Sequence, residues 1–228
     1  MKELWLQRNN GSNLIIFCNG WGMDGKPFQR LSTANHDVFM LYDYTHFDHS
    51  INVDVLVGSY RHITLIGWSM GVWVAQELFS TNKKIFDRTI AINGTLCPVS
   101  DTFGIPEKLF DGTISGFGEA GLLKFYRRMC KNKTNLKRFL QNRPERTLEN
   151  QLNELIALRK NTNCVSSEDS IFDEIIIADN DFIVPSENQH RFWQDHLVKS
   201  IKGHHFLFNL WDSWDQLLMT IAISDEQV

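Results

Sequence analysis

The chain has 228 residues, of which 43% are apolar, 22% charged and 12% aromatic. This composition excludes a disordered or fibrous protein, and the length suits one sizeable hydrophobic core rather than two. The net charge of −4 and a pI near 6.1 exclude a bulk attraction for nucleic acid. No apolar run approaches the roughly 20 residues of a membrane-spanning helix, and the first eight residues lack a signal peptide's apolar stretch. We therefore expect a cytoplasmic protein that binds neither nucleic acid nor a membrane.

Short apolar runs alternate with helical patterns along most of the chain. Runs typical of strands buried on both faces lie at residues 14–18, 38–42, 63–66, 88–92 and 174–178, and a last strand is expected at 197–201. Helical patterns lie between them at residues 72–79 and 189–197. This succession predicts the α/β class, with an open, mostly parallel, doubly wound sheet.

The alternation stops after Asn93 and resumes near Asp173. The intervening stretch begins with loop sequence that contains Gly and Pro. Helical patterns follow around residues 119–131, 134–142 and 145–160. No linker indicates a second fold. We therefore predict a single domain over residues 1–228 with a mainly helical cap inserted at about 97–170.

The four cysteines are scattered and form no C-x-x-C pair; they are Cys18, Cys97, Cys130 and Cys164. In a chain of this size, such spacing favours reduced thiols that pack as small apolar groups over a disulfide framework or a zinc site. Cys18 ends an apolar run, so we expect it in the core.

Residues 67–71 read Gly-Trp-Ser-Met-Gly, directly after one expected strand and directly before an expected helix. A G-x-S-x-G sequence in that position is typical of a strained turn that exposes a nucleophilic serine. A serine hydroxyl is a poor nucleophile, so Ser69 needs a base and the base needs an orienting carboxylate. The simpler alternative is an ordinary glycine-rich turn between strand and helix.

A carboxylate follows the strand at 174–178, on the sheet edge where ligands gather in open α/β folds. We favour Asp181 over Asp179, because x-I-V-P follows it as in the hydrolase pattern G-x-x-D-x-[IV]-V-P, although Ala178 replaces the first glycine of that pattern. The alternative is that Asp181 only caps its own turn.

Two histidines follow in the segment Gly203-His204-His205-Phe206, which completes the chain order Ser…Asp…His. Consecutive residues point in different directions, so only one of them can meet Ser69. We favour His205 as the base, because G-x-H-aromatic resembles the base motif of hydrolases that act on carrier-bound acyl chains. His204, directly after the glycine, stays open as the alternative.

Acyl transfer also needs two N–H donors for the developing oxyanion. The residue after the nucleophile, Met70, supplies one candidate amide. The glycine-rich loop at residues 19–25 follows an early strand and supplies the other, for which we choose the N–H of Trp21. The Trp21 ring lines the acyl pocket in this interpretation, and it is a buried aromatic beside a turn in the alternative.

One segment suggests metal chemistry instead. Residues 44–49, Tyr-Thr-His-Phe-Asp-His, nearly match the H-x-H-x-D-H sequence of two-metal hydrolases, but Tyr44 stands at the first ligand position. Catalytic zinc requires three well-placed ligands and an open site. We therefore expect no metal and a surface or loop role for this segment.

The charge is unevenly distributed. Residues 124–146 contain nine basic residues and one acidic residue and carry +8, whereas the rest of the chain, with 14 basic and 26 acidic residues, carries −12. The segment is either a solvated helix face or a docking surface for an acidic partner.

At these residues the chain resembles the α/β-hydrolase superfamily over its whole length. It resembles more closely the BioG-type pimeloyl-[acyl-carrier-protein] methyl ester esterases of bacterial biotin synthesis. The segments that carry the closer resemblance are N-G-W-G at 19–22, L-Y-D-Y at 41–44, Y-R-H-I at 60–63, G-W-S-M-G-V-W-V-A at 67–75, I-N-G-T at 92–95 and F-G-I-P at 103–106. Asn19 departs from the wider superfamily, in which many members carry histidine.

The resemblance implies a serine carboxylesterase that converts pimeloyl-[acyl-carrier protein] methyl ester to the free ω-carboxylate and methanol. In that scheme His205, oriented by Asp181, deprotonates Ser69, and the Met70 and Trp21 amides bind the oxyanion. It implies no metal and no organic cofactor.

The resemblance also gives the basic segment a partner, because acyl carrier proteins are acidic and would dock on residues 124–146. Two other functions stay open. One is a type II-like thioesterase that cuts the thioester, and the other is a hydrolase scaffold kept as a non-catalytic binding module.

Overall fold

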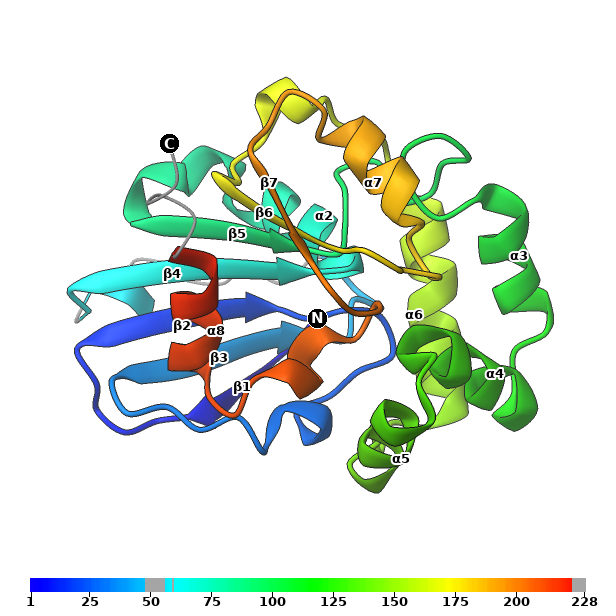
Figure 1. Cartoon of the computed structure of the whole chain (residues 1–228), viewed down its shortest axis with the longest axis horizontal. Helices are drawn as coiled ribbons and strands as arrows, with labels where there is room; N and C mark the ends of the chain where they lie inside the picture. The colour runs from blue at the N-terminus through cyan, green and yellow to red at the C-terminus, as the bar shows by residue number, and fades with distance from the viewer. Residues whose placement is uncertain (48–55, 59, 223–228) are drawn as a thin grey trace.

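A seven-stranded sheet forms the centre of the protein (Figure 1). The computed structural model describes residues 1–47, 56–58 and 60–222. The strands are β1 (Lys2–Gln7), β2 (Asn13–Cys18), β3 (His36–Tyr42), β4 (His62–Trp68), β5 (Arg88–Ile92), β6 (Glu174–Ala178) and β7 (Val198–Ile201). They lie in the order β1-β3-β2-β4-β5-β6-β7, and of these pairs only β1 with β3 is antiparallel. The sheet is the mostly parallel one predicted, in the order of an α/β-hydrolase fold.

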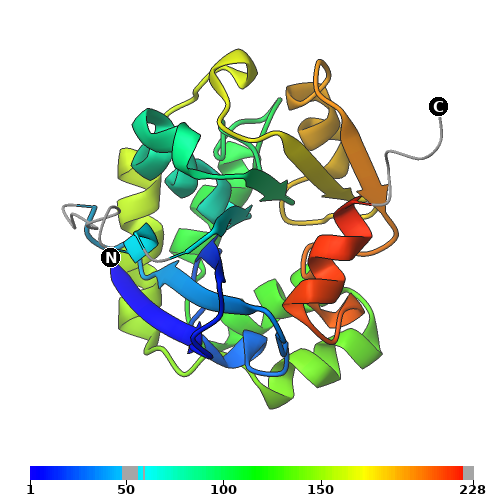
Figure 2. The same ribbon diagram turned by 90° about the vertical axis from the view of Figure 1, so that its left-hand side faces the viewer.

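Helices cover both faces of this sheet. Helix α2 (Met70–Phe79) packs on β4 and β2, and α8 (Trp214–Ala222) lies on the opposite face (Figure 2). Helix α7 (Ser186–Phe192) packs beside β6. The predicted helix at 189–197 therefore lies too late in the chain, because Pro185 sits at the helix start and Trp193 already ends it.

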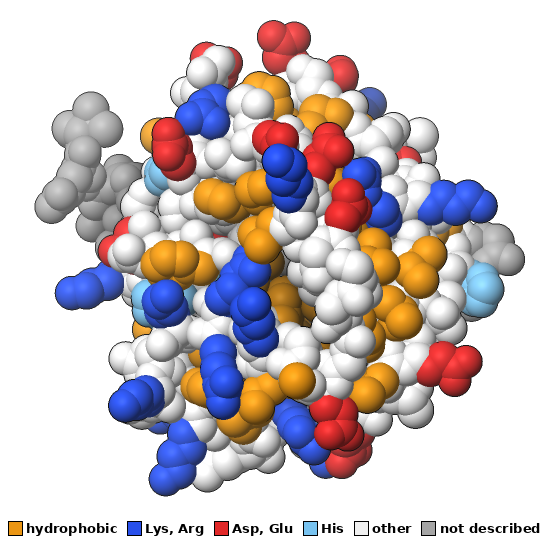
Figure 3. Space-filling view, turned by 90° about the vertical axis from the view of Figure 1, so that its right-hand side faces the viewer, with side chains coloured by type: hydrophobic (Ala, Val, Ile, Leu, Met, Phe, Trp, Pro, Cys, Tyr) orange, Lys and Arg blue, Asp and Glu red, His pale blue; other side chains and the backbone are white. Residues whose placement is uncertain are grey.

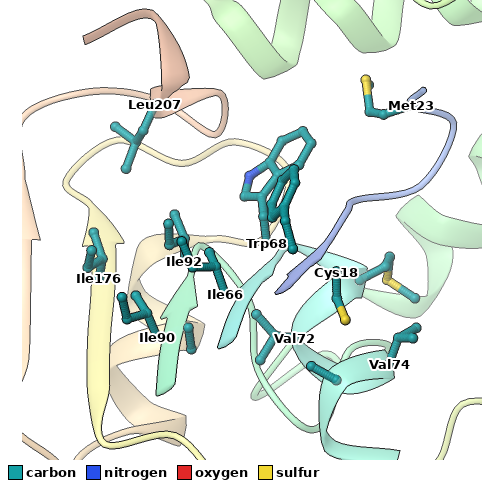
Figure 4. Packing of buried hydrophobic residues seen from close by; sticks show 14 of the residues in the cluster. Cys18, Met23, Ile66, Trp68, Val72, Val74, Ile90, Ile92, Ile176 and Leu207 are labelled. Carbon is teal, nitrogen blue, oxygen red and sulfur yellow. The ribbon is translucent and has the colours of Figure 1, made fainter. Parts of the chain in front are cut away.

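The core consists of the apolar side chains that these strands and helices share. Ile66, Ile90 and Ile176 come from three neighbouring strands, and Val72 of α2 packs next to them (Figure 4). Each is almost completely removed from solvent. Burial of one such side chain stabilises the fold by about 1.5–3 kcal/mol before the conformational entropy is counted.

The strands β2 to β7 end nearly level with one another. In the parallel register Cys18 pairs with Gly67, Trp68 with Ile92, and Ala178 with Ile201. The residues that directly follow these strands therefore meet at the carboxyl edge of the sheet, although up to 136 residues separate them in sequence.

Four helices lie over that edge, inserted between β5 and β6 (Figure 1). They are α3 (Glu107–Ser115), α4 (Glu119–Cys130), α5 (Lys133–Gln141) and α6 (Leu148–Asn161), and we call them the cap. The last three match the predicted helices, whereas α3 falls in a stretch predicted as loop. None of the helices in the described part of the chain is long and apolar enough to cross a membrane.

Two of the four cysteines form a disulfide, Cys97–Cys164. The expectation of reduced thiols is wrong for this pair, because β5 and β6 are neighbours and bring together the two ends of the cap segment, 67 residues apart. A disulfide is typical of oxidising compartments and contrasts with the cytoplasmic location that we expect. Cys18 and Cys130 are free and buried, and burial raises the pKa of the Cys130 thiol to about 12.

Candidate active site

Ser69 lies in the sharp turn between β4 and α2. Its φ of 56° and ψ of −123° are values that a residue with a side chain seldom adopts. Gly71 permits the turn, because a Cβ at that position would lie 2.0 Å from the Cys18 carbonyl oxygen. The start of α2 therefore packs directly on the end of β2, and the turn holds the Ser69 side chain at the carboxyl edge of the sheet.

Three distant side chains meet at this turn. His205 Nε2 lies 2.9 Å from Ser69 Oγ, and His205 Nδ1 lies 2.7 Å from Asp181 Oδ2. All three residues are buried, with His205 only 1% exposed. With the proton on Nδ1, the imidazole donates to Asp181 and accepts from the Ser69 hydroxyl, which is the arrangement required for proton removal from serine.

The Asp181 carboxylate is held in place by its own turn. Its Oδ1 accepts hydrogen bonds from the backbone N–H groups of Ile183 and Val184, at 2.8 and 3.1 Å. Its Oδ2 accepts from Gln189 Nε2 at 3.0 Å as well as from His205. Gln189 was not singled out from the sequence, because a glutamine in a helix carries no chemical signature.

The alternatives weighed for the acid and the base lie elsewhere. Asp179 is exposed and accepts a hydrogen bond from the Gly203 N–H at 2.8 Å. His204 is half-buried, and its Nδ1 lies 2.9 Å from the Asn180 carbonyl oxygen. Neither of them contacts Ser69, so the geometry favours Asp181 and His205.

Asn93, at the end of β5, joins the loops that carry the acid and the base. Its Nδ2 donates to the His205 carbonyl oxygen at 2.9 Å, and its Oδ1 accepts from the Ala178 N–H at 2.7 Å. Trp68 Nε1 donates to the same His205 carbonyl at 3.1 Å. Sequence reasoning assigned Asn93 no role, although it follows a strand directly and belongs to the I-N-G-T segment of the family resemblance.

The glycine-rich loop after β2 passes directly over Ser69. A Cβ on Gly20 would lie 2.9 Å from two ring carbons of Trp68 and 3.3 Å from the Ser69 Cβ, so a side chain there would displace the Trp68 ring. The Gly20 N–H donates to Asn19 Oδ1 at 2.8 Å, and the Gly22 N–H donates to Glu154 Oε2 at 2.9 Å. Within residues 1–47, 56–58 and 60–222, the Trp21 N–H between them donates to no protein acceptor.

Met70 supplies a second backbone donor beside the nucleophile. It is the first residue of α2, so its N–H has no acceptor within the helix. Both Trp21 and Met70 line the pocket next to Ser69. Two free N–H groups beside a serine hydroxyl are the arrangement that stabilises an oxyanion.

The pocket next to Ser69 is mainly apolar. The cap contributes Leu109, Phe125 and Leu155, and of the described lining side chains only His205 and Arg128 can carry charge. An open cleft of about 230 Å³ adjoins it; the two share Leu109, Thr113, Phe125 and Arg128, and Lys108 and Lys124 also line the cleft. The guanidinium of Arg128 donates to the Phe182 carbonyl at 2.9 Å, and burial lowers its pKa below the ordinary value.

The basic segment divides into two parts. Seven cations are exposed and form no ion pair with a described residue: Lys124, Arg127, Lys131, Lys133, Lys137, Arg138 and Arg143. Lys and Arg gather on the lower part of the cap face, with hydrophobic side chains between them (Figure 3). Arg146 is different, because its side chain is 5% exposed and pairs with Glu154 and Asp43. The ninth cation, Arg128, is half-buried, so the interpretation of the whole segment as an exposed face is wrong at Arg146 and holds only in part at Arg128.

The segment considered for metal binding lies partly within the structure. Tyr44 is buried, and its hydroxyl lies 2.8 Å from the Asn19 carbonyl oxygen. Asp48 and His49 fall outside the described residues. In the part of the chain that the structure covers, no three His, Cys, Asp or Glu side chains are grouped so that they could hold a metal ion.

The sheet topology, with a buried serine, histidine and aspartate at its carboxyl edge, places the chain among the α/β hydrolases. Solved structures with low identity share that fold, such as a lipase-esterase related protein from Clostridium acetobutylicum, with a TM-score of 0.58, 13% identity and coverage of 97% of this chain and 98% of that one. Residues 1–217 match the family described as "Pimeloyl-ACP methyl esterase BioG".

Two individual relatives support the same assignment. BioG from Haemophilus influenzae has a crystal structure that superposes with a TM-score of 0.83 at 30% identity, covering 95% of this chain and 99% of that one. An uncharacterized protein of the same organism is 34% identical over 214 residues, covering 91% of this chain and 94% of its own length. The chain belongs to the BioG family of pimeloyl-ACP methyl esterases, which are carboxylic ester hydrolases of biotin synthesis.

A third relative is much longer than this chain. A malonyl-[acyl-carrier protein] O-methyltransferase of Bacteroides fragilis is 34% identical over 194 residues. The match covers 84% of this chain and 39% of that protein, so this chain spans well under half of its length.

Proposed function

We propose that this chain hydrolyses the methyl ester of pimeloyl-acyl carrier protein with Ser69 as the nucleophile. The observation that carries the proposal is the continuous chain of short contacts from Asp181 through His205 to Ser69 beside an apolar pocket. Family membership supplies the substrate, and the site supplies the groups that ester hydrolysis requires.

In the first half of the reaction, Ser69 Oγ attacks the ester carbonyl while His205 Nε2 takes its proton. The carbonyl oxygen becomes an oxyanion that the Trp21 and Met70 amides stabilise, each by roughly 3 kcal/mol in the transition state. Asp181 keeps the imidazole oriented and stabilises it while it is charged. His205 then protonates the departing methoxide, which leaves as methanol.

In the second half, water replaces methanol. His205 removes a proton from the water as it attacks the acyl carbonyl, and it returns that proton to Ser69 Oγ as the bond between the acyl group and Oγ breaks. The product is the ω-carboxylate on the carrier. A charged carboxylate is poorly solvated in an apolar pocket, so the product leaves more readily than the neutral ester.

The longer relative supports a carrier-bound methyl ester as the substrate. Its name describes methyl transfer to a malonyl group on an acyl carrier protein, and part of that protein is similar to this chain. A methyl ester on a carrier-bound acyl group is the bond whose hydrolysis we propose.

The acyl carrier protein docks, in this proposal, on the exposed cations Lys124, Arg127, Lys131, Lys133, Lys137 and Arg138, which we call the cap cation surface. Lys124 also lines the open cleft that adjoins the Ser69 pocket. An acidic protein bound there would have its acyl arm next to the cleft, and attraction between opposite charges would speed the encounter.

Methanol release from the methyl ester of pimeloyl-acyl carrier protein tests the reaction. Ser69→Ala is expected to lower it by at least roughly 10³-fold, because attack by serine is lost. Ser32→Ala, at a serine remote from the site, is the matched control. Substantial methanol release by a folded Ser69→Ala protein would contradict the proposal. Release of free methyl pimelate without methanol would identify a thioesterase. The absence of any turnover by the wild type would favour the remaining alternative, a non-catalytic binding module.

A further inference from the structure

Glu154 of cap helix α6 has an acidic side chain that is completely removed from solvent, as is that of Asp181 in the candidate triad. Its Oε2 accepts from the Gly22 N–H at 2.9 Å and lies 2.7 Å from Arg146 Nη1. Its Oε1 accepts from the Tyr44 N–H at 2.8 Å. A buried carboxylate is costly unless its oxygens are paired, and here both are.

The charge of Glu154 is balanced by a buried cluster. Arg146 pairs with Glu154 and also lies 3.1 Å from Asp43 Oδ1, and the partly exposed Lys2 pairs with Asp43 at 2.9 Å. The two cations and two carboxylates sum to zero. Arg146 Nη1 also donates to the Met23 carbonyl at 3.2 Å. The cluster is therefore hydrogen-bonded to the loop after β2 at both Gly22 and Met23.

Helix α6 hydrogen-bonds to the Trp21 side chain and to the residue that follows it. The Glu154 carboxylate accepts a hydrogen bond from the N–H of Gly22, the residue after Trp21. Gly22 has a φ of +74°, in the left-handed region that glycine adopts readily, and a glycine backbone without this bond would have considerable conformational freedom. The Gln151 carbonyl accepts from the Trp21 indole Nε1 at 2.8 Å. The Trp21 backbone N–H has no acceptor among the described residues, and the N–H groups of Gly20 and Gly22 on either side of it are both hydrogen-bonded.

We propose that Glu154 is a positioning residue for the oxyanion hole, which makes the cap part of the catalytic machinery. The inference rests on the proposed esterase function. An oxyanion donor accelerates a reaction only when it is aimed before charge develops. The Glu154 carboxylate orients the Trp21 N–H in advance, because it fixes the adjacent Gly22 peptide and thereby limits the directions in which the Trp21 N–H can point.

The substitution Glu154→Gln tests the proposal, since it keeps the side-chain shape and removes the charge and one acceptor oxygen. We expect kcat to fall at least about tenfold, below the roughly 10²–10³-fold loss when a donor is removed. KM should change little, for both a small soluble ester and the carrier-bound ester. Affinity for a boronic acid transition-state analogue should fall by the same factor as kcat, with active sites counted by complete fluorophosphonate titration.

Glu145→Gln is the matched control, because Glu145 forms an exposed ion pair with Lys26 between the cap and the same loop. We expect its kcat and analogue affinity to equal those of the wild type. A Glu154→Gln protein with kcat within about twofold of the wild type would overturn the positioning role. Loss of activity in Ser69→Ala would leave the esterase function standing in that case, so the two failures are distinguishable.

Amide hydrogen exchange in the wild type keeps the proposal testable if Glu154→Gln does not fold. The Gly22 amide should exchange slowly with and without the boronic acid. The Trp21 amide should exchange fast in the free enzyme and become protected when the analogue binds. A Gly22 amide that exchanges as fast as an exposed loop would overturn the proposal.

Discussion

Asn93 hydrogen-bonds to both segments that carry the acid and the base of the candidate triad. Its amide satisfies the Ala178 N–H and the His205 carbonyl, both in the protein interior. Its φ of 49° also suits asparagine better than most residues with a side chain. The position therefore combines a local backbone requirement with two long-range hydrogen bonds.

Asn93→Ala should lower the free energy of unfolding by about 1–3 kcal/mol, because the buried Ala178 N–H loses its bond to Asn93 and the His205 carbonyl keeps only its bond from Trp68 Nε1. It should also lower kcat, since His205 loses one of the bonds that fix its backbone. Urea denaturation and steady-state kinetics measure the two effects. Asn161→Ala, which removes only a bond within α6, should change neither. An Asn93→Ala protein as stable as the wild type would contradict this structural role of the Asn93 amide.

The residues of the site differ in how far the sequence could predict them. Ser69 and Asp181 lie in local motifs next to strands with strong apolar patterns. The choice of His205 over His204 depended on a resemblance, because the two histidines are adjacent and either one follows the last strand closely enough to be the base. Glu154 could not be found, since its partner Gly22 is 132 residues away and a glutamate in a helix usually faces solvent.

At the scale of elements, the buried parallel strands were the most predictable. The bounds of β5 and β6 agree with those predicted, because continuous apolar runs between polar turns are typical of such strands. The edge strand β1 was missed because its first three residues are exposed. Helix α3 was missed because loop-like sequence lies on both sides of it, at residues 104–106 and 116–118; Pro106 and Gly116 are in fact its N-cap and C-cap.

Strand β3 is anchored by a carboxylate near its start. Asp37 Oδ1 accepts from the N–H groups of Asn9 and Gly11, at 2.7 and 3.1 Å, and its Oδ2 accepts from the Tyr60 hydroxyl at 2.8 Å. Burial alone would raise the pKa of Asp37, but these hydrogen bonds outweigh it and hold the pKa below its ordinary value. The ionised form is thus favoured in the folded protein.

Stability should therefore depend on pH through Asp37. Its contribution is complete above the unfolded pKa of about 3.9 and is lost as the pH falls through that value to the lower folded pKa. Asp37→Asn should be about 1–3 kcal/mol less stable than the wild type at neutral pH. The two unfolding free energies should converge in acid, in urea titrations at a series of pH values. A constant difference across the series would refute this assignment.

For the molecule as a whole, the cap cation surface contrasts with a protein of net negative charge. The double reversal Arg127→Glu with Lys131→Glu should lower kcat/KM for the carrier-bound ester by about tenfold at low salt, because attraction to an acidic carrier is lost. The difference should shrink as ionic strength rises. Small soluble esters should react at the wild-type rate.

Lys84→Glu serves as the control for that reversal, because Lys84 is exposed and lies just before β5, at the end of the sheet away from the cap. It should leave both substrates unaffected. Equal losses of kcat/KM on the carrier-bound and the small ester, in the double reversal, would argue against docking at this surface.

The organisation of the chain as a single domain with a cap at about 97–170 also belongs to the scale of the whole molecule, and it stays a prediction.

The Cys97–Cys164 bond gives the cap a covalent boundary. A protease that cuts the backbone once anywhere from α3 to α6 would sever the polypeptide without releasing either piece. The nicked molecule would still migrate as one species under denaturing conditions, and thiol reduction would split it into two. The enzyme could therefore carry a broken main chain and still keep Glu154 tethered to the sheet that bears Ser69.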